Sequence, residues 1–143
     1  MIGKCNPLNI RTSAYFKWAG QTGETRGFCD FEDVTMCRRA GAYLLMRSYR
    51  RCGITKLRDV INRFAPAVEN DTDAYISFVC KRTEFKPYTE LVFDSDFAAV
   101  LAAMEIFEQG VHASMRDGYY FNAKASYIYV INQFNLRKYE IKS

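Results

Sequence analysis

An apolar repeat near residue 100 constrains the fold of this chain more than any other feature of its sequence. Six apolar residues recur there at three- and four-residue intervals, which places them on one face of an α-helix; they are Phe97, Val100, Leu101, Met104, Phe107 and Val111. We expect Ser95 to cap this helix and Gly110 to end it, since glycine readily adopts the left-handed conformation. With 143 residues, 49% of them apolar, the chain has the size and composition of one folded domain and is not intrinsically disordered.

Three more helices are predicted before this one, each beginning at a side chain that can accept hydrogen bonds from exposed backbone N–H groups. These caps are Asp33, Thr55, and either Asn70 or Asp71. The first helix runs to about residue 52, where Gly53 ends it. The second stops before Pro66, because proline disfavours helical conformation at the residue that precedes it.

Two regions favour β-structure. Residues 1–30 are rich in Gly, Asn and Thr, which predicts loops and a hairpin around Gly20–Gly27. Near the C-terminus, residues 126–134 (SYIYVINQF) are β-branched and aromatic and are expected to form a strand paired with residues 119–122. The predicted fold class is therefore α+β, mainly helical, with a C-terminal β-hairpin extension.

The cysteines and the termini bear on compartment. No CxxC pair occurs and the one histidine, His112, is distant in sequence from the cysteines, so we expect no zinc site and no cofactor. Cys37, Cys52 and Cys80 occur among apolar residues and are expected to be buried, reduced thiols, as in a cytoplasmic protein. We expect neither a signal peptide nor a membrane span, because no apolar run is long enough for either.

The charge balance is mildly basic. Twenty Lys and Arg against sixteen Asp and Glu leave a formal charge of +4, and five arginines fall within the first predicted helix: Arg38, Arg39, Arg47, Arg50 and Arg51. A solvated helix face and attraction to an anionic polymer both explain this pattern. Nucleic-acid binding is disfavoured, because the chain has no zinc site, no RNP-like strand and no recognisable helix-turn-helix.

Three segments resemble a family of small phage and prophage virion proteins that look lysozyme-like. They are residues 6–11 (NPLNIR) with 18–23 (WAGQTG), residues 61–76 (INRFAPAVENDTDAYI) and residues 107–110 (FEQG). The resemblance covers roughly residues 3–110. The chain departs from the family pattern at Gln109, where Asn is usual, and at Ala67, where Pro is usual.

This resemblance implies a lysozyme-like catalytic domain at residues 1–110 and an extension at residues 111–143 packed on it. In the lysozyme and lytic transglycosylase superfamily a catalytic Glu ends a helix that leads into the substrate cleft. Glu108 matches that role late in the chain, as in a circular permutation. The alternatives are that Glu108 is a solvated surface residue or that Glu105, one turn earlier, is the acid.

Eight further residues are candidates for substrate binding. Amide and indole side chains suit sugar binding, because amides hydrogen-bond hydroxyl and acetamido groups and an indole face stacks on a pyranose. The resemblance implies that two residues at the helix start after residue 68 line the cleft and that Tyr75 reaches toward the catalytic carboxyl. The candidates are Asn6, Asn9, Arg11, Trp18, Gln21, Glu69, Thr72 and Tyr75. Turn formation, helix capping and core packing explain the same residue types without function.

The expected function is cleavage of peptidoglycan glycan strands with Glu108 as general acid/base and no metal. Glu24 and Asp30 are the candidates for a second acid; without one, the chemistry favours a lytic transglycosylase over a hydrolase. The alternative is a non-catalytic virion structural protein, with residues 111–143 docking other virion proteins. In either case we expect synthesis in the host cytoplasm and action at the cell wall or within a virion.

Overall fold

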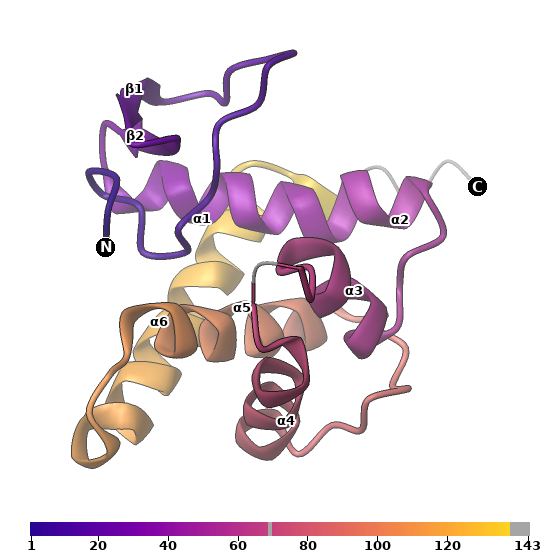
Figure 1. Ribbon diagram of the computed structural model, residues 1–143. Coiled ribbons are helices and arrows are strands. Elements are labelled where there is room, and N and C mark those ends of the chain that lie inside the picture. The colour runs from indigo at the N-terminus through magenta and orange to yellow at the C-terminus, as the bar shows by residue number, and fades with distance from the viewer. Residues whose placement is uncertain (69, 138–143) are drawn as a thin grey trace.

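A computed structural model of the protein describes residues 1–68 and 70–137 (Figure 1). The fold is α+β and mainly helical, as predicted from the sequence. A small antiparallel hairpin comprises β1 (Gln21–Thr25) and β2 (Phe28–Phe31). The helical elements are α1 (Val34–Tyr43), the π-helical turn η1 (Leu44–Ser48), α2 (Tyr49–Arg51), α3 (Leu57–Phe64), α4 (Thr72–Thr83), α5 (Asp94–Gln109), the 3-10 turn η2 (Ala113–Met115) and α6 (Arg116–Gln133).

Helix α5 is the centre of the core. Every residue from Phe97 to Ile106 is buried, because α1, α4 and α6 all pack against it. The predicted end at Gly110 is confirmed by its left-handed φ of 58°. The predicted cap at Ser95 is wrong, because the helix begins at Asp94 and Phe93 occupies the capping position. The Asp96 carboxylate accepts hydrogen bonds from the N–H groups of Val92 and Phe93.

The predicted N-terminal hairpin is confirmed and lies over α1 (Figure 1). Its turn consists of Arg26 and Gly27, both with positive φ, which matches the right-handed twist of the two strands. The segment before the hairpin lies along β2, since the N–H of Cys29 donates to the carbonyl of Ile10 at 2.9 Å and that of Phe31 to Lys4 at 2.8 Å.

The first predicted helix is confirmed as the continuous run α1–η1–α2, with a π-helical turn in its middle. Asp33 caps it by accepting from the N–H of Met36 at 3.0 Å, and Gly53 follows it with a φ of 75°. Gly41 is required by close packing, because a Cβ at this position would lie 2.3 Å from a methyl carbon of Leu8. The N-terminal segment can therefore lie directly against α1.

Helices α3 and α4 also lie where the sequence predicts them. Asp71 caps α4 by accepting from the N–H of Ala74 at 3.1 Å, which decides between the two expected caps. The predicted cap of α3 at Thr55 is wrong: the Thr55 hydroxyl donates to the Glu90 carboxylate at 2.5 Å, and Lys56 occupies the capping position without a side-chain bond.

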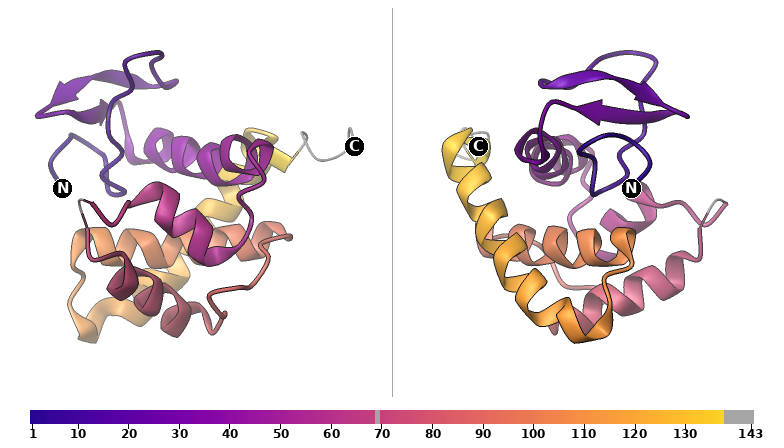
Figure 2. Two further views of the ribbon diagram at one scale, coloured as in Figure 1. Left: turned by 45° about the vertical axis from the view of Figure 1, so that its right-hand side comes forward. Right: turned by 90° about the vertical axis from the view of Figure 1, so that its left-hand side faces the viewer.

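The predicted C-terminal β-hairpin is wrong, because residues 116–133 form the helix α6. In Figure 2 this helix runs from beside α5 up to the level of α1. Its buried residues recur at helical spacing and join the same hydrophobic core as α5; they are Tyr120, Ala123, Tyr127, Val130 and Ile131. Burial of this face outweighs the strand preference of the β-branched and aromatic run.

A buried carboxylate joins α6 to the rest of the fold. Glu105 of α5 is fully buried, and both of its oxygens accept hydrogen bonds from the Arg38 guanidinium of α1, at 3.1 and 2.9 Å. The hydroxyls of Tyr119 and Tyr127 on α6 donate to the same carboxylate at 2.5 and 2.9 Å. Four donors thus satisfy the charge, and Glu105 has a structural explanation.

The expected burial of the cysteines is confirmed only in part. All five are free thiols; Cys37 is buried, Cys80 is half-buried and Cys52 is exposed at the end of α2. Burial raises the pKa of Cys37 to about 12, which keeps its thiol protonated. None of the helices described is both long and apolar enough to cross a membrane.

Candidate functional site

A groove of about 410 Å³ runs between the N-terminal loop and the end of α3, and Glu108 lines it. One wall comes from residues 9–18 and β2, and the other from the end of α3 and the turn after it. The residues that line it are mostly aromatic or polar: Asn9, Ile10, Arg11, Ser13, Phe16, Trp18, Phe28, Leu44, Tyr49, Arg63, Phe64, Ala65, Pro66, Asn70 and Glu108. Such a concave, part-aromatic surface with a few polar groups is typical of a ligand site.

Glu108 occupies the last turn of α5 and is half-buried. Its Oε1 accepts a hydrogen bond from the Asn9 side-chain amide at 2.9 Å. Burial raises the pKa of Glu108 above its ordinary value, against the opposing influence of Asn9, the Tyr75 hydroxyl and the positive charge of Arg11. The group is thus protonated over a wider pH range than a solvated glutamate.

Asn9 reaches Glu108 because of an unusual backbone conformation. Its φ of 52° lies in the left-handed region, which asparagine tolerates better than most residues. The turn is held by Asn6, whose side-chain amide donates to the carbonyls of Ile10 and Cys29 at 2.9 Å and whose oxygen accepts from the Ile10 N–H at 2.9 Å. Asn6 therefore shapes the loop that presents Asn9.

Tyr75 lies beneath Glu108, buried in the core. Its ring stacks on Phe107 with centroids 4.1 Å apart and an interplanar angle of 26°. Burial and the neighbouring Glu108 carboxylate raise the pKa of Tyr75 well above its ordinary value. One buried polar atom beside the carboxyl, the Asn9 Oδ1, has no hydrogen-bond partner among the residues that the structure describes. Buried polar atoms without a partner are uncommon in folded proteins, so the position of this one beside Glu108 is notable.

Trp18 and Phe16 form the aromatic rim of the groove. Their rings meet edge to face, with centroids 4.9 Å apart and an interplanar angle of 89°. Arg11 lies over the ring of Phe28, with its guanidinium carbon 4.6 Å from the centroid. The groove wall therefore combines flat apolar surface with a positive charge.

Four of the sequence-predicted site residues line the groove: Asn9, Arg11, Trp18 and Glu108. Tyr75 does not line it but is buried next to Glu108. Three others are placed elsewhere. Asn6 has no exposed surface, so it does not contact a ligand. Thr72 is buried, and its hydroxyl donates to the Ala65 carbonyl at 2.6 Å. Gln21 lines a separate hollow, and its side-chain oxygen accepts from the backbone N–H of Trp18 at 3.0 Å. Glu69 lies outside the described residues.

The two acids considered as partners of Glu108 are not in the groove. Glu24 lines the separate hollow near Gln21. Asp30 accepts hydrogen bonds from the Lys4 N–H and the Thr25 hydroxyl, both at 2.8 Å, and these bonds lower the pKa of its carboxyl. Among the described lining residues, Glu108 is the only acid.

The sequence did not indicate several other groove residues, chiefly Phe16, Phe28, Tyr49 and Arg63, and it indicated Asn70 only as part of the helix start after residue 68. Phe16 and Phe28 flank the recognised WAGQTG segment, and that proximity was the one available signal. Arg63 and Asn70 come from the far wall, whose position depends on how α3 packs. Within residues 1–68 and 70–137, no group of three His, Cys, Asp or Glu side chains could hold a metal ion.

Comparison with known proteins relates this chain to a bacteriophage protein. The chain matches no protein-family model. It is 33% identical to protein P5 of Pseudoalteromonas phage PM2 over 109 residues, which are 73% of this chain and 68% of the relative. The chain belongs to the P5 family. It is thereby related to a bacteriophage protein, and the relative's name assigns no activity.

Proposed function

We propose that this phage-related protein cleaves the glycan strands of peptidoglycan, with Glu108 as general acid/base. The observation that carries the proposal is a half-buried carboxyl of raised pKa that lines an aromatic groove. Glycosidic bonds break when a carboxylic acid that is still protonated near neutral pH donates to the leaving oxygen. The resemblance of residues 3–110 to lysozyme-like phage proteins supports the same function.

In this mechanism Glu108 acts twice. Protonated Glu108 donates its proton to the glycosidic oxygen while the bond from that oxygen to the sugar carbon breaks and positive charge develops on the ring. The resulting carboxylate then takes a proton from the attacking group. The Asn9 amide, 2.9 Å from Oε1, stabilises the charged form and holds the carboxyl in position between the two steps.

The walls of the groove supply the binding contacts that a sugar strand needs. Phe16 and Trp18 offer ring surface for the apolar faces of pyranose rings. Asn70 on the opposite wall offers an amide to acetamido and hydroxyl groups, and Arg11 offers a charge-assisted donor. We propose these residues, with Asn9, as the substrate contacts.

The surroundings of Glu108 favour a single-acid mechanism. No other acid lines the groove among the described residues, whereas hydrolases usually hold two carboxyls about 5 to 9.5 Å apart. In a lytic transglycosylase the substrate's own hydroxyl or acetamido group completes the reaction instead of water. Mass spectrometry of the released fragments tests this choice, because transglycosylation gives anhydro products that lack one water.

The decisive test is Glu108→Gln, which keeps the shape of the side chain and removes the proton donor. We expect clearance of purified cell walls to fall by about 10²- to 10⁴-fold. The matched control is Glu24→Gln, the same chemical change at an exposed acid outside the groove. Clearance by Glu108→Gln at the wild-type rate would falsify the mechanism.

A non-catalytic virion structural protein remains the second candidate. Two observations favour it: the relative is a phage protein, and exposed aromatic residues of α6, Phe121 and Tyr129, offer apolar surface to other virion proteins. Saturable binding of cell walls without clearance would support this candidate over the enzyme. Under both candidates we propose that the protein acts at the bacterial cell wall or within a virion.

A further inference from the structure

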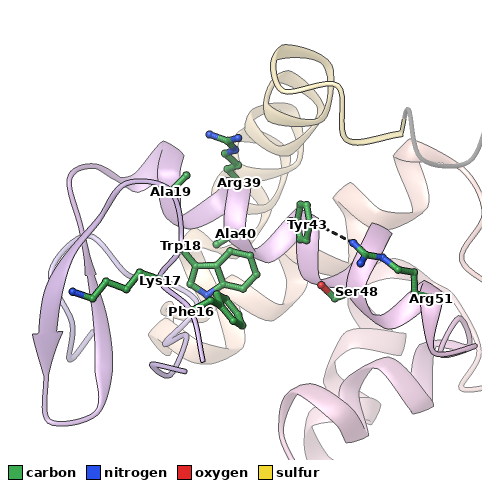
Figure 3. A pocket seen from close by; sticks show the side chains of 9 residues that line it. All are labelled: Phe16, Lys17, Trp18, Ala19, Arg39, Ala40, Tyr43, Ser48 and Arg51. Atoms are coloured by element: carbon green, nitrogen blue, oxygen red, sulfur yellow. Dashed lines mark hydrogen bonds between the residues drawn. The ribbon is translucent and has the colours of Figure 1, made fainter. Parts of the chain in front are cut away.

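A second hollow, of about 380 Å³, adjoins the groove, because Phe16 and Trp18 line both (Figure 3). Its other wall belongs to the first long helix, where Tyr43 ends α1 and Ser48 ends the π-helical turn. The two cavities therefore lie next to each other at Phe16 and Trp18. Its volume falls in the range of small-ligand sites.

The centre of this hollow is aromatic. Trp18 meets Tyr43 edge to face, with centroids 5.8 Å apart and an interplanar angle of 72°, and Phe16 packs on Trp18 from the other direction. These contacts hold the indole in place between the two cavities. The exposed ring surface suits the alkyl part of a ligand but supplies few hydrogen bonds.

The rim of the hollow is cationic. Figure 3 shows Lys17, Arg39 and Arg51 on three different sides of the aromatic cluster. Arg51 donates to the Tyr43 hydroxyl at 2.9 Å, and Arg39 lies over the Phe134 ring, 4.3 Å from its centroid. None of the described residues that line the hollow is an acid. Cations at separate points suit a ligand with several spaced anionic groups better than a single phosphate.

We propose that this hollow binds the carboxylate-bearing peptide that branches from a peptidoglycan strand, an inference that rests on the proposed function of the groove. A strand bound in the groove would contact Trp18, which also lines the hollow, so a branch of that strand can extend into the hollow. Stem peptides are chains of amide-linked residues that carry several carboxylates separated by alkyl carbons, which matches a cationic rim around aromatic rings. Guanidinium groups also pair well with carboxylates.

Binding can be measured directly, because Trp18 is the only tryptophan in the sequence. The parent for the binding measurements is the full-length Glu108→Gln variant, which is expected to be inactive. The probe is the free stem peptide without glycan. We expect the peptide to change Trp18 fluorescence saturably. We expect Lys17→Glu and Arg39→Gln each to weaken binding by about threefold or more, the order of one exposed ion pair.

Two controls separate charge from packing. Arg39→Lys keeps the positive charge and is expected to keep most of the affinity, whereas Arg39→Gln loses both charge and the contact with Phe134. Lys81→Glu makes the same charge reversal on α4 at a residue that lines neither cavity, and it is expected to bind like the parent.

The outcomes distinguish this inference from the proposed function. If the wild-type protein clears cell walls but the stem peptide does not bind, or binds equally to Lys17→Glu, the inference is wrong and the enzyme stands. If the peptide binds as expected but the wild type clears no wall, the enzyme fails and the hollow remains a peptide site. Stronger, salt-sensitive binding of a single-stranded oligonucleotide than of the peptide would overturn the inference.

Discussion

Glu105 and Glu108 lie one turn apart on α5, yet their surroundings differ completely. Glu105 has no exposed surface and accepts four hydrogen bonds, two from Arg38 and one each from two tyrosines. Glu108 is half-buried, accepts one side-chain bond from Asn9 and lines a groove. One carboxylate has its charge satisfied inside the protein, whereas the other has a pKa raised by burial.

The difference shows that burial alone does not mark a catalytic acid. A buried carboxylate with a guanidinium and two hydroxyls is stabilised as an ion and joins helices together. A carboxyl that is desolvated without enough donors holds its proton, which is what acid catalysis requires. Variants of the two acids and of the residues that contact them therefore separate the structural role from the catalytic one.

The largest effect is expected from removing the structural acid. Glu105→Ala leaves the Arg38 guanidinium and two tyrosine hydroxyls without their partner in the core, and we expect the free energy of unfolding to fall by about 3–5 kcal/mol. Denaturant unfolding measures this. Glu108→Ala is the matched change, and an equal loss of stability in both variants would contradict the contrast.

A smaller effect is expected from removing one donor of the network. Tyr127→Phe deletes a single hydroxyl that donates to Glu105 at 2.9 Å, so we expect a loss of about 1–3 kcal/mol. Tyr129→Phe, at an exposed position of the same helix, is the control and should unfold like the wild type. If Tyr127→Phe unfolds with the same free energy as the wild type, the hydroxyl does not stabilise the attachment of α6.

The pH profile of activity should respond to Asn9. Asn9→Gly keeps the left-handed conformation but removes the amide that lowers the pKa of Glu108. Since the acid must be protonated to act, the alkaline limb of the pH–rate profile should move to higher pH. Asn135→Gly, also at a left-handed position, should leave the profile unchanged. A limb that moves to lower pH would contradict the role given to Asn9.

The smallest effect concerns stability against pH. The folded-state pKa of Glu108 lies above its ordinary value of 4.5. At pH values between these two pKa values, the folded state therefore binds more protons than the unfolded state. The contribution of Glu108 to stability therefore declines as pH rises from about 4.5 toward the folded pKa, and stays lowered above it. Glu108→Gln should remove this slope and be at least as stable as wild type near neutral pH, measured by thermal unfolding across pH.

Local sequence signals predicted much of the fold because they act within a few residues. The periodic apolar residues of α5, the Asp33 and Asp71 caps and Gly110 all operate over one or two helical turns. The same kind of signal failed for residues 126–134, where a β-branched and aromatic run favours a strand. Packing against α1 and α5, with Tyr127 bonded to Glu105, decides for a helix instead.

The candidate site was predictable only as separate segments. Motif resemblance drew attention to Asn9, Trp18 and Glu108, which the structure brings to one groove. It also drew attention to Asn6 and Thr72, whose side chains are buried and bonded to backbone carbonyls. Whether an amide faces a ligand or its own backbone depends on contacts with residues far along the chain, and spacing carries no information about those contacts.

The order of residues along the chain was enough to predict a mainly helical domain with an apolar helix that ends in Phe107-Glu108-Gln109-Gly110. Helix periodicity and capping follow from neighbouring residues, so a single chain suffices to read them. The contacts that distinguish the two acids come from packing: Glu105 accepts hydrogen bonds from Arg38 and two tyrosines, whereas Glu108 accepts one from Asn9, which is 99 residues away. The ionisation of a carboxyl depends on the donors and solvent that surround it in space, and chain packing alone brings those together.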